Sequence, residues 1–291
     1  MKLRDLAELL LLAALWGGSF LFMRIAAPSL GPVWLIALRV LIGGLGLMPL
    51  VMRRQLGRQL WQHRRSLLIV GGLNSAIPFV LFAFAALSLS AGFTSILNAT
   101  VPLFGTIVAA VWLKERLTLP RIIGLILGFI GVSTLVGQGG QTTLTTTTDF
   151  LGAVGAGLVA SVLYALTAPY IKQTLAGVPS LVVATGSQLG AACLLLPALP
   201  FTIPTQPPSA TVLLSVVALA LFSTALAYIL YFRLLNNIGV TRTLTVTYLI
   251  PLFAMVWGAL FLQEAITITM ALGCGLILGG TAIVNGVFTA K

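Results

Sequence analysis

The charged side chain best placed to bind a small molecule is Arg39, which lies inside a long apolar segment. The five acidic residues are near segment ends or in loops, so no carboxylate lies near a segment centre. An ionisable residue inside a membrane-spanning segment is by default a functional candidate. Arg39 must contact backbone carbonyls, a helix end, an acid at a segment end or the carboxylate of a bound molecule. A structural role and a binding role both stay open.

Polar and aromatic side chains share one face in two further segments. In the first they recur at spacings of three and four, which places them on one side of a helix: Asn74, Ser75, Pro78, Phe79 and Phe82. The same face 149 residues later carries Ser223, Thr224, Ala227, Tyr228 and Tyr231. Such a lining suits an amphipathic molecule with a ring or aliphatic body and an amino or carboxyl end. For any single ring, helix packing or a position at the membrane interface is the simpler interpretation.

Three prolines fall inside apolar segments and are predicted to break helices there: Pro78, Pro102 and Pro251. Proline lacks an N–H and its ring clashes with the carbonyl four residues earlier. The freed carbonyls would be those of Asn74, Asn98 and Thr247. A free backbone group at membrane depth is tolerated only where it is buried in protein or lines a wet cavity. The alternative is a kink that serves only helix packing.

These features together predict one cavity near the membrane midplane. Its substrate-binding lining would comprise Trp16, Ser19, Arg39, Asn74, Phe79, Phe82, Asn98, Tyr164, Tyr228, Tyr231 and Thr247. The two cysteines have no CxxC spacing and no histidine nearby, so they are most simply small apolar residues. We therefore expect no metal site and no cofactor.

The composition is that of an integral membrane protein. Hydrophobic residues make up 59% of the chain and charged residues 7%, and the mean hydropathy is +1.11; an average soluble domain has roughly 25% charged residues. A spanning helix needs roughly 20 apolar residues. The chain offers ten such runs, at 6–27, 33–52, 67–88, 92–113, 119–137, 150–172, 179–199, 210–233, 240–262 and 267–288. We predict an all-α membrane protein with ten transmembrane helices.

The sequence repeats after 149 residues, about half its length. The tripeptide Pro-Leu-Phe at 102–104 recurs at 251–253, and Glu115 recurs as Glu264. Looser matches at a shift of 148 include Arg24 with Lys172. The two glutamates would lie at opposite membrane faces, where each could cap a helix end or pair with a neighbouring arginine in a gate.

An internal duplication with an odd number of spans in each half has a geometric consequence. The second half must enter the membrane in the opposite orientation, an architecture typical of secondary transporters. We predict inverted repeats at 1–137 and 150–291, joined by a Thr-rich outer linker at 138–149. Alternating access would move the two bundles around the cavity, with Gly92 and Gly239 as hinges.

Basic residues are confined to one side of the predicted membrane. Of the 16, Arg24 and Arg39 lie inside spans, and the other 14 fall in loops or at span ends on the same face: Lys2, Arg4, Arg53, Arg54, Arg58, Arg64, Arg65, Lys114, Arg116, Arg121, Lys172, Arg233, Arg242 and Lys291. By the positive-inside rule this face and both termini are cytoplasmic. The formal charge of +11 is therefore a topology signal, and nucleic-acid binding is not expected.

The same residues carry a family resemblance over essentially the whole chain. The run 15–20 (Leu-Trp-Gly-Gly-Ser-Phe) with Arg24, the Pro32 to Arg39 spacing and the block 102–118 before a Gly-rich helix resemble the drug/metabolite transporter superfamily. More narrowly, they are similar to its ten-helix bacterial members with two EamA-like repeats, and most of all to the aromatic amino-acid exporter branch. The second half departs from the pattern at Gln263, where the first has Lys114.

This resemblance implies an exporter in the bacterial inner membrane that acts as a monomer or weak dimer. Its substrates would be small amphipathic metabolites, with amino acids, including aromatic ones, as the main expectation and amphipathic cations as the alternative. No intramembrane acid or histidine is present for a proton relay. A membrane-embedded enzyme would need paired acids, HExxH or GxSxG, none of which occurs. A channel would require symmetric rings of charge or carbonyls.

Overall fold

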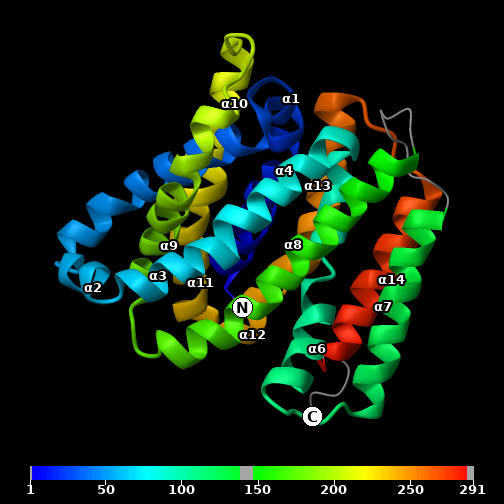
Figure 1. Ribbon diagram of the computed structural model, residues 1–291. Helices are drawn as coiled ribbons and strands as arrows, with labels where there is room; N and C mark the ends of the chain where they lie inside the picture. Colours follow the sequence, from blue (N-terminus) through cyan, green and yellow to red (C-terminus); the bar gives the residue numbers. More distant parts are fainter. Residues whose placement is uncertain (1, 138–146, 287–291) are drawn as a thin grey trace.

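The computed structural model describes residues 2–137 and 147–286, which form a bundle of helices (Figure 1). The first helix, α1 (Leu3–Arg53), contains the first two predicted spans. They join at Gly31, whose φ of 72° and ψ of 155° lie outside the helical region. Glycine adopts a positive φ without a steric penalty, so α1 is two helices that meet at this residue.

The other predicted spans each correspond to one helix or to two or three consecutive helical pieces. These are α3 (Arg64–Gly71), η1 (Gly72–Ala76) and α4 (Ile77–Ser88); α5 (Ala91–Asn98) and α6 (Val101–Trp112); α7 (Leu119–Gly137); α8 (Thr147–Thr174); α9 (Ser180–Leu195) and η2 (Leu196–Phe201); α10 (Ala210–Ala220), η3 (Leu221–Leu226) and α11 (Ala227–Ile238); α12 (Val240–Leu244) and α13 (Val246–Leu262); and α14 (Ile268–Val284). The short α2 (Gly57–Gln62) lies in a loop.

The number of spans agrees with the prediction. In the described part of the chain, seven helical stretches are long and apolar enough to cross a membrane, and α13 and α14 are shorter apolar helices. Because α1 holds two spans, the total is ten, and the ten-helix all-α membrane fold is confirmed. Of the predicted linker, 138–146 lies outside the described residues, and Thr147–Asp149 already belong to α8.

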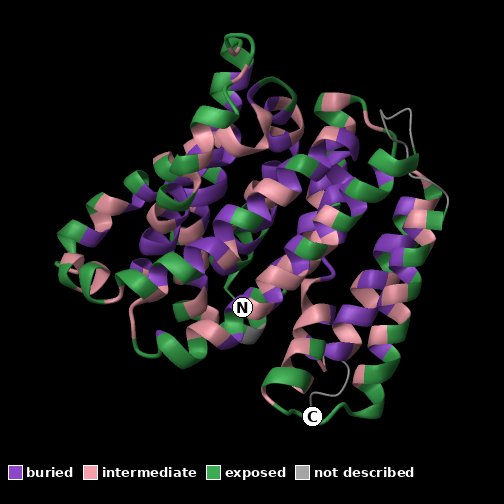
Figure 2. Ribbon diagram, in the orientation of Figure 1, coloured by how far each residue is buried: buried purple, intermediate pink, exposed green. Residues whose placement is uncertain are grey.

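Apolar side chains cover the outside of the bundle. Val111, Leu214 and Ile126 are 76%, 69% and 56% exposed. Figure 2 shows the buried residues along the helix faces that point into the bundle. A soluble monomer rarely exposes apolar surface on this scale, whereas lipid tails are a suitable environment for it.

Contacts between the two halves occur in exchanged pairs. The first half of α1 packs on α13, and α8 correspondingly packs on α5 and α6. The second half of α1 packs on η3 through Gly43 and Thr224, and α9 correspondingly packs on η1 and α3. Helices α7 and α14 pack against each other and lie side by side in Figure 1. The halves are therefore related by an approximate two-fold exchange.

Two π-helical turns occur at equivalent places in the halves. The turn η1 begins at Gly72 and η3 begins at Leu221, 149 residues later. Pro78 follows η1 within the first turn of α4, but Ala227 stands at the matching position after η3. The π turn therefore does not depend on proline. Such turns are rare in proteins, and those that occur are often at functional sites. Neither turn was expected from the sequence.

The other two prolines differ in their effect on the backbone. Residues 99 and 100 separate α5 from α6 just before Pro102. Pro251, in contrast, lies inside α13, which continues from Val246 to Leu262, and the break in that span is at Thr245. The helix break placed at Pro251 is therefore wrong in position. Loss of one hydrogen bond does not end the helix here, and Ile250, Pro251 and Ala254 are all buried within it.

Candidate functional site

A cavity of about 660 Å³ occupies the centre of the bundle. It is lined mainly from α1, α4, α8, α9, α11, α13, both π turns and the break between α5 and α6, with single residues from α3, α12 and α14. All eleven residues predicted to line a cavity contribute to it: Trp16, Ser19, Arg39, Asn74, Phe79, Phe82, Asn98, Tyr164, Tyr228, Tyr231 and Thr247. Pro102 also lines it. The structure thus brings the set together, and their part in substrate binding stays a prediction.

Arg39 is the charged group of this cavity, and its side chain is held by neutral partners. The residue is only 4% exposed. Its Nε donates a hydrogen bond to Thr224 Oγ1 at 3.2 Å, and its guanidinium carbon lies 3.8 Å from the centroid of the Phe79 ring. None of the ion pairs among the described residues includes Arg39. The hydrogen bond and the ring fix the position of the charge without neutralising it.

Aromatic rings form two clusters in the cavity lining. On one side Tyr164 stacks on Phe82 with centroids 5.9 Å apart and meets Phe79 edge to face at 6.2 Å. On the other side Trp16 and Tyr231 have centroids 5.4 Å apart, and Tyr228 stacks on Phe232 at 5.8 Å. In the first cluster Tyr164 belongs to the second half of the chain and Phe82 to the first. In the second cluster Trp16 belongs to the first half and Tyr231 to the second. The positions of the rings therefore depend on how the halves pack.

Polar groups lie in the cavity lining and directly behind it. Ser19 Oγ is buried without a hydrogen-bond partner. Gln188 Nε2 donates to Ser75 Oγ at 3.0 Å, next to Asn74 in η1. Asn98 ends α5 and is half-buried at the cavity. Buried polar atoms normally have partners, so the unpaired Ser19 hydroxyl is suited to a bound molecule.

One end of the cavity leads toward basic residues. A neighbouring cavity of about 540 Å³ is lined by Arg54 and Arg233, and it shares Ser180, Phe232 and Leu235 with the central one. Ile171 and Leu175, near Lys172 at the end of α8, also line the central cavity. We call this the basic end. By the charge distribution of the sequence it is the expected cytoplasmic side.

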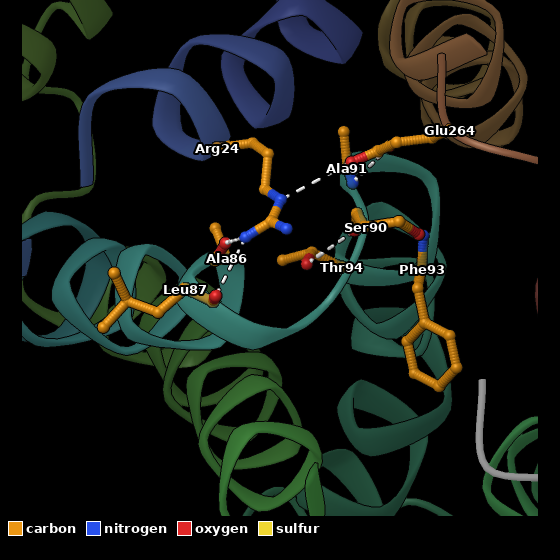
Figure 3. Close-up of polar contacts among 8 residues, drawn as sticks. All are labelled: Arg24, Ala86, Leu87, Ser90, Ala91, Phe93, Thr94 and Glu264. Carbon is orange, nitrogen blue, oxygen red and sulfur yellow. Dashed lines mark hydrogen bonds and ion pairs between the residues drawn. The ribbon is translucent and has the colours of Figure 1, made fainter. Parts of the chain in front are cut away.

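A polar cluster holds the helices together at the opposite end (Figure 3). Arg24 Nε lies 3.5 Å from Glu264 Oε1, and Arg24 Nη1 donates to the carbonyls of Ala86 and Leu87 at 2.8 Å each. Glu264 Oε2 accepts a hydrogen bond from Ala91 N at 2.9 Å. The glutamate therefore both caps a helix and pairs with an arginine. The residues of this cluster were not among the predicted site residues. The signal that could have found them is the recurrence of Glu115 as Glu264.

Burial shifts the acidity of this glutamate. Desolvation raises the pKa of the Glu264 carboxyl, and the Ala91 N–H and Arg24 oppose that rise without cancelling it. The ionised form thus gains less from its two partners than it loses by leaving water, as is common for partly buried pairs.

The two predicted hinge glycines have different surroundings. Gly239 connects α11 to α12 with a φ of 81°, and no atom lies near the place of a side chain. Gly92 lies in the first turn of α5, where a Cβ atom would come within 2.6 Å of Met255 Cγ. The first glycine permits an unusual backbone and the second permits close packing. Their part in a motion stays a prediction.

Comparisons with known proteins agree on one family. The model of the EamA-like transporter family matches residues 6–137 and 151–286. Transporter YvbV of Bacillus subtilis is 27% identical over 98% of this chain and 92% of the relative. A probable terminal-alkyne amino-acid exporter of Streptantibioticus cattleyicolor is 26% identical over 95% of this chain and 92% of the relative. A crystal structure covers the whole of both chains with a TM-score of 0.65 at 20% identity, which is evidence for the fold alone.

Proposed function

Because this chain belongs to the EamA-like transporter family, we propose that it exports small amphipathic metabolites, chiefly amino acids, through the central cavity. The family makes the chain a multi-pass membrane transporter and not an enzyme, in agreement with the sequence prediction. The two family matches support the division into repeats at 1–137 and 150–291. The substrate class, the direction and the orientation in the membrane are our proposal.

The observation that carries the proposal is Arg39 in the cavity. A buried guanidinium without a carboxylate partner is costly, and a substrate carboxylate supplies the missing counter-charge with charge-assisted hydrogen bonds. Nη1 has only a weak contact, 3.9 Å from Met23 Sδ. A carboxylate that accepts from it stays beside the phenyl ring of Phe79, where the arginine is already held.

The rest of the lining fits the remaining parts of an amino acid. Tyr164, Phe82 and Trp16 offer ring faces to an apolar or aromatic side chain. The amide oxygens of Asn74 and Asn98 are acceptors for an ammonium group. Aromatic amino acids are thus candidate substrates, and the named amino-acid exporter among the relatives supports the class without favouring aromatic members.

Export of amphipathic cations is the second candidate. The rings of Trp16 and Tyr231 are suited to cation–π contact. Arg39 places a positive charge in the same cavity, however, and repels a cation unless the cation brings its own anionic group. This makes amino acids the better fit.

The proposed cycle is alternating access between two inverted repeats. The central cavity reaches residues of the basic end, among them Ile171 and Leu235, so we take that end as the open one, and by the positive-inside rule we assign it and both termini to the cytoplasm. The setting would be a bacterial inner membrane. Opening of the opposite end and closure of the basic end would then release the substrate outward, with motion of the two halves about their two-fold relation.

Uptake into proteoliposomes tests the proposal. Labelled tryptophan, phenylalanine, threonine and methionine are supplied with and without a pH gradient, to wild type and to Arg39→Gln, Asn98→Ala and Tyr228→Ala. We expect transport by wild type without need of a pH gradient, and loss in all three variants. The control is Arg53→Gln, which changes an exposed arginine outside the cavity. Transport of an amphipathic cation without any amino acid would overturn the amino-acid proposal.

A further inference from the structure

The backbone that presents Glu264 to the polar cluster has a copy at the basic end. Gln263 and Lys114, the residues before the two glutamates, both have a φ of 56°. Glu264 N donates to Gly258 O at 3.1 Å, and Glu115 N donates to Ala109 O at 3.2 Å. These donors and acceptors are each 149 residues apart. The two loops therefore place their glutamates in the same way on opposite ends of the bundle.

The residues that meet Glu264 also have counterparts at the basic end. Lys172 matches Arg24 at a shift of 148 and stands near the end of α8, as an exposed cation. Leu235 and Asn236 match Ala86 and Leu87, whose carbonyls accept from Arg24. Leu235 lines both cavities. A cation and two carbonyls are thus present around the basic end.

Glu115 has a different partner in this structure. Its Oε2 lies 3.0 Å from Arg121 Nη1, and the glutamate side chain is 46% exposed. The loop before α7 and the end of α8 both lie at the lower end of the bundle in Figure 1. A pair that is exposed to this extent contributes little to stability, so exchange of Arg121 for another cation has a small energetic cost.

One difference between the halves limits what the copy can do. Gly258 leaves room for Glu264 Oε2, which lies where a Cβ atom would be. Ala109 stands at the matching place in the first half. Glu264 Oε2 occupies this space when it caps α5, and the Cβ atom of Ala109 fills the matching space beside Glu115. Glu115 therefore cannot cap a helix in the same way, but it can form the equivalent ion pair.

We propose that Glu115 and Lys172 form the ion pair that closes the basic end when the transporter faces outward. Lys172 then also donates to the carbonyls of Leu235 and Asn236, as Arg24 does to Ala86 and Leu87. Arg24 with Glu264 and Lys172 with Glu115 are alternatives within one cycle: each pair is intact when the other is broken. This inference rests on the proposed alternating access, and not on the identity of the substrate.

Crosslinking tests the closure without any assay of transport. Cys193→Ser and Cys274→Ala remove the native thiols, and Glu115→Cys with Lys172→Cys introduces a pair at the basic end. We expect a short bifunctional thiol reagent to crosslink this pair in membrane vesicles, in a fraction of molecules that face outward. The control pair Arg121→Cys with Lys172→Cys should not react. Absence of the crosslink in protein that transports substrate overturns the closure.

Charge exchange separates the proposed pair from the one present in this structure. Glu115→Lys should lower transport roughly fivefold to tenfold, an effect of the size seen for coupled charges. Adding Lys172→Glu should restore most of the lost rate. Rescue by Arg121→Glu in place of Lys172→Glu would mean that Glu115 only stabilises the loop, and would overturn the proposal. Crosslinking without transport of any amino acid would contradict the proposed function and leave the closure supported.

Discussion

The guanidinium of Arg39 lies over the phenyl ring of Phe79, with 3.8 Å between its central carbon and the ring centroid, and it donates a hydrogen bond to Thr224 across the interface of the two halves. Phe79 comes from α4 in the first half and Thr224 from η3 in the second. The position of the charge thus depends on both repeats. A relative movement of the halves changes the contacts of Arg39, which couples the binding group to the conformation.

Thr224→Val removes the oxygen that accepts from Arg39 Nε and keeps the shape of the side chain. A buried donor left without its partner costs about 1 to 3 kcal/mol, so we expect the variant to unfold at a lower temperature in detergent. Thr134→Val is the control, because Thr134 is only partly buried and its hydroxyl donates to a carbonyl of its own helix, Ile130 O. Equal melting temperatures for the two variants would show that Thr224 does not hold Arg39.

Gly280→Ala should destabilise the contact between α7 and α14. A Cβ atom at Gly280 would clash with the carbonyl oxygen of Gly124 and with Gly128 N, and overpacking of this kind costs about 1 to 3 kcal/mol. Gly275→Ala is the matched control in the same helix, because no atom lies within 4 Å of the added group. We expect thermal unfolding to detect the first change and not the second. A larger effect of Gly275→Ala would instead indicate a contact with a second copy.

Pro78→Ala should leave transport within about twofold of wild type. The equivalent π turn η3 forms with Ala227 at the matching position, so η1 should persist when the proline is replaced. Uptake of labelled substrate measures the outcome. A loss of tenfold or more, with normal expression and melting temperature, would show that the proline itself has a part in the cycle.

Acid should favour the closed form of the end that holds Glu264. Burial raises the pKa of this carboxyl in the closed form, whereas a hydrated glutamate in the open form keeps its ordinary pKa. The closed form therefore binds the proton more tightly, and protonation shifts the equilibrium toward it. This preference is present at low pH and is lost as the pH rises through the raised pKa.

The labelling rate of Thr94→Cys measures this equilibrium, because Thr94 is fully buried beside the cluster. The rate is divided by that of Ser209→Cys, an exposed position on the same side, so that thiol ionisation cancels. We expect the ratio to fall as the outer pH falls. The Glu264→Gln variant should show a flat ratio, and an unchanged slope in that variant would assign the pH dependence to another group.

The sequence is sufficient to predict the spans and the composition of the cavity, because the apolar runs and the polar and aromatic helix faces each occur twice, once in each half. Apolar runs of spanning length identify the helices, and the 149-residue shift links Phe79 to Tyr228 and Asn98 to Thr247. These residues come together for the same reason in each half. The pattern of spans therefore places side chains on shared faces before any contact is known.

The backbone irregularities could not be predicted in the same way. Proline chemistry correctly drew attention to the segment before Pro102, but Pro251 lies within a continuous helix and the break at Thr245 has no proline. The π turn η3 has none either. Packing between halves decides these features, and it also decides that Glu264 caps α5 and binds Arg24 at once.

The most direct test of the account is the binding of phenylalanine and of phenethylamine, which lacks the carboxylate, to purified wild type and Arg39→Gln. We predict that wild type binds phenylalanine at least about thirtyfold more tightly than Arg39→Gln does, since breaking a buried charge pair costs about 2 kcal/mol or more. Phenethylamine should bind the variant as well as, or better than, wild type. Equal loss of affinity for both ligands would contradict the assignment of Arg39 as the carboxylate-binding group.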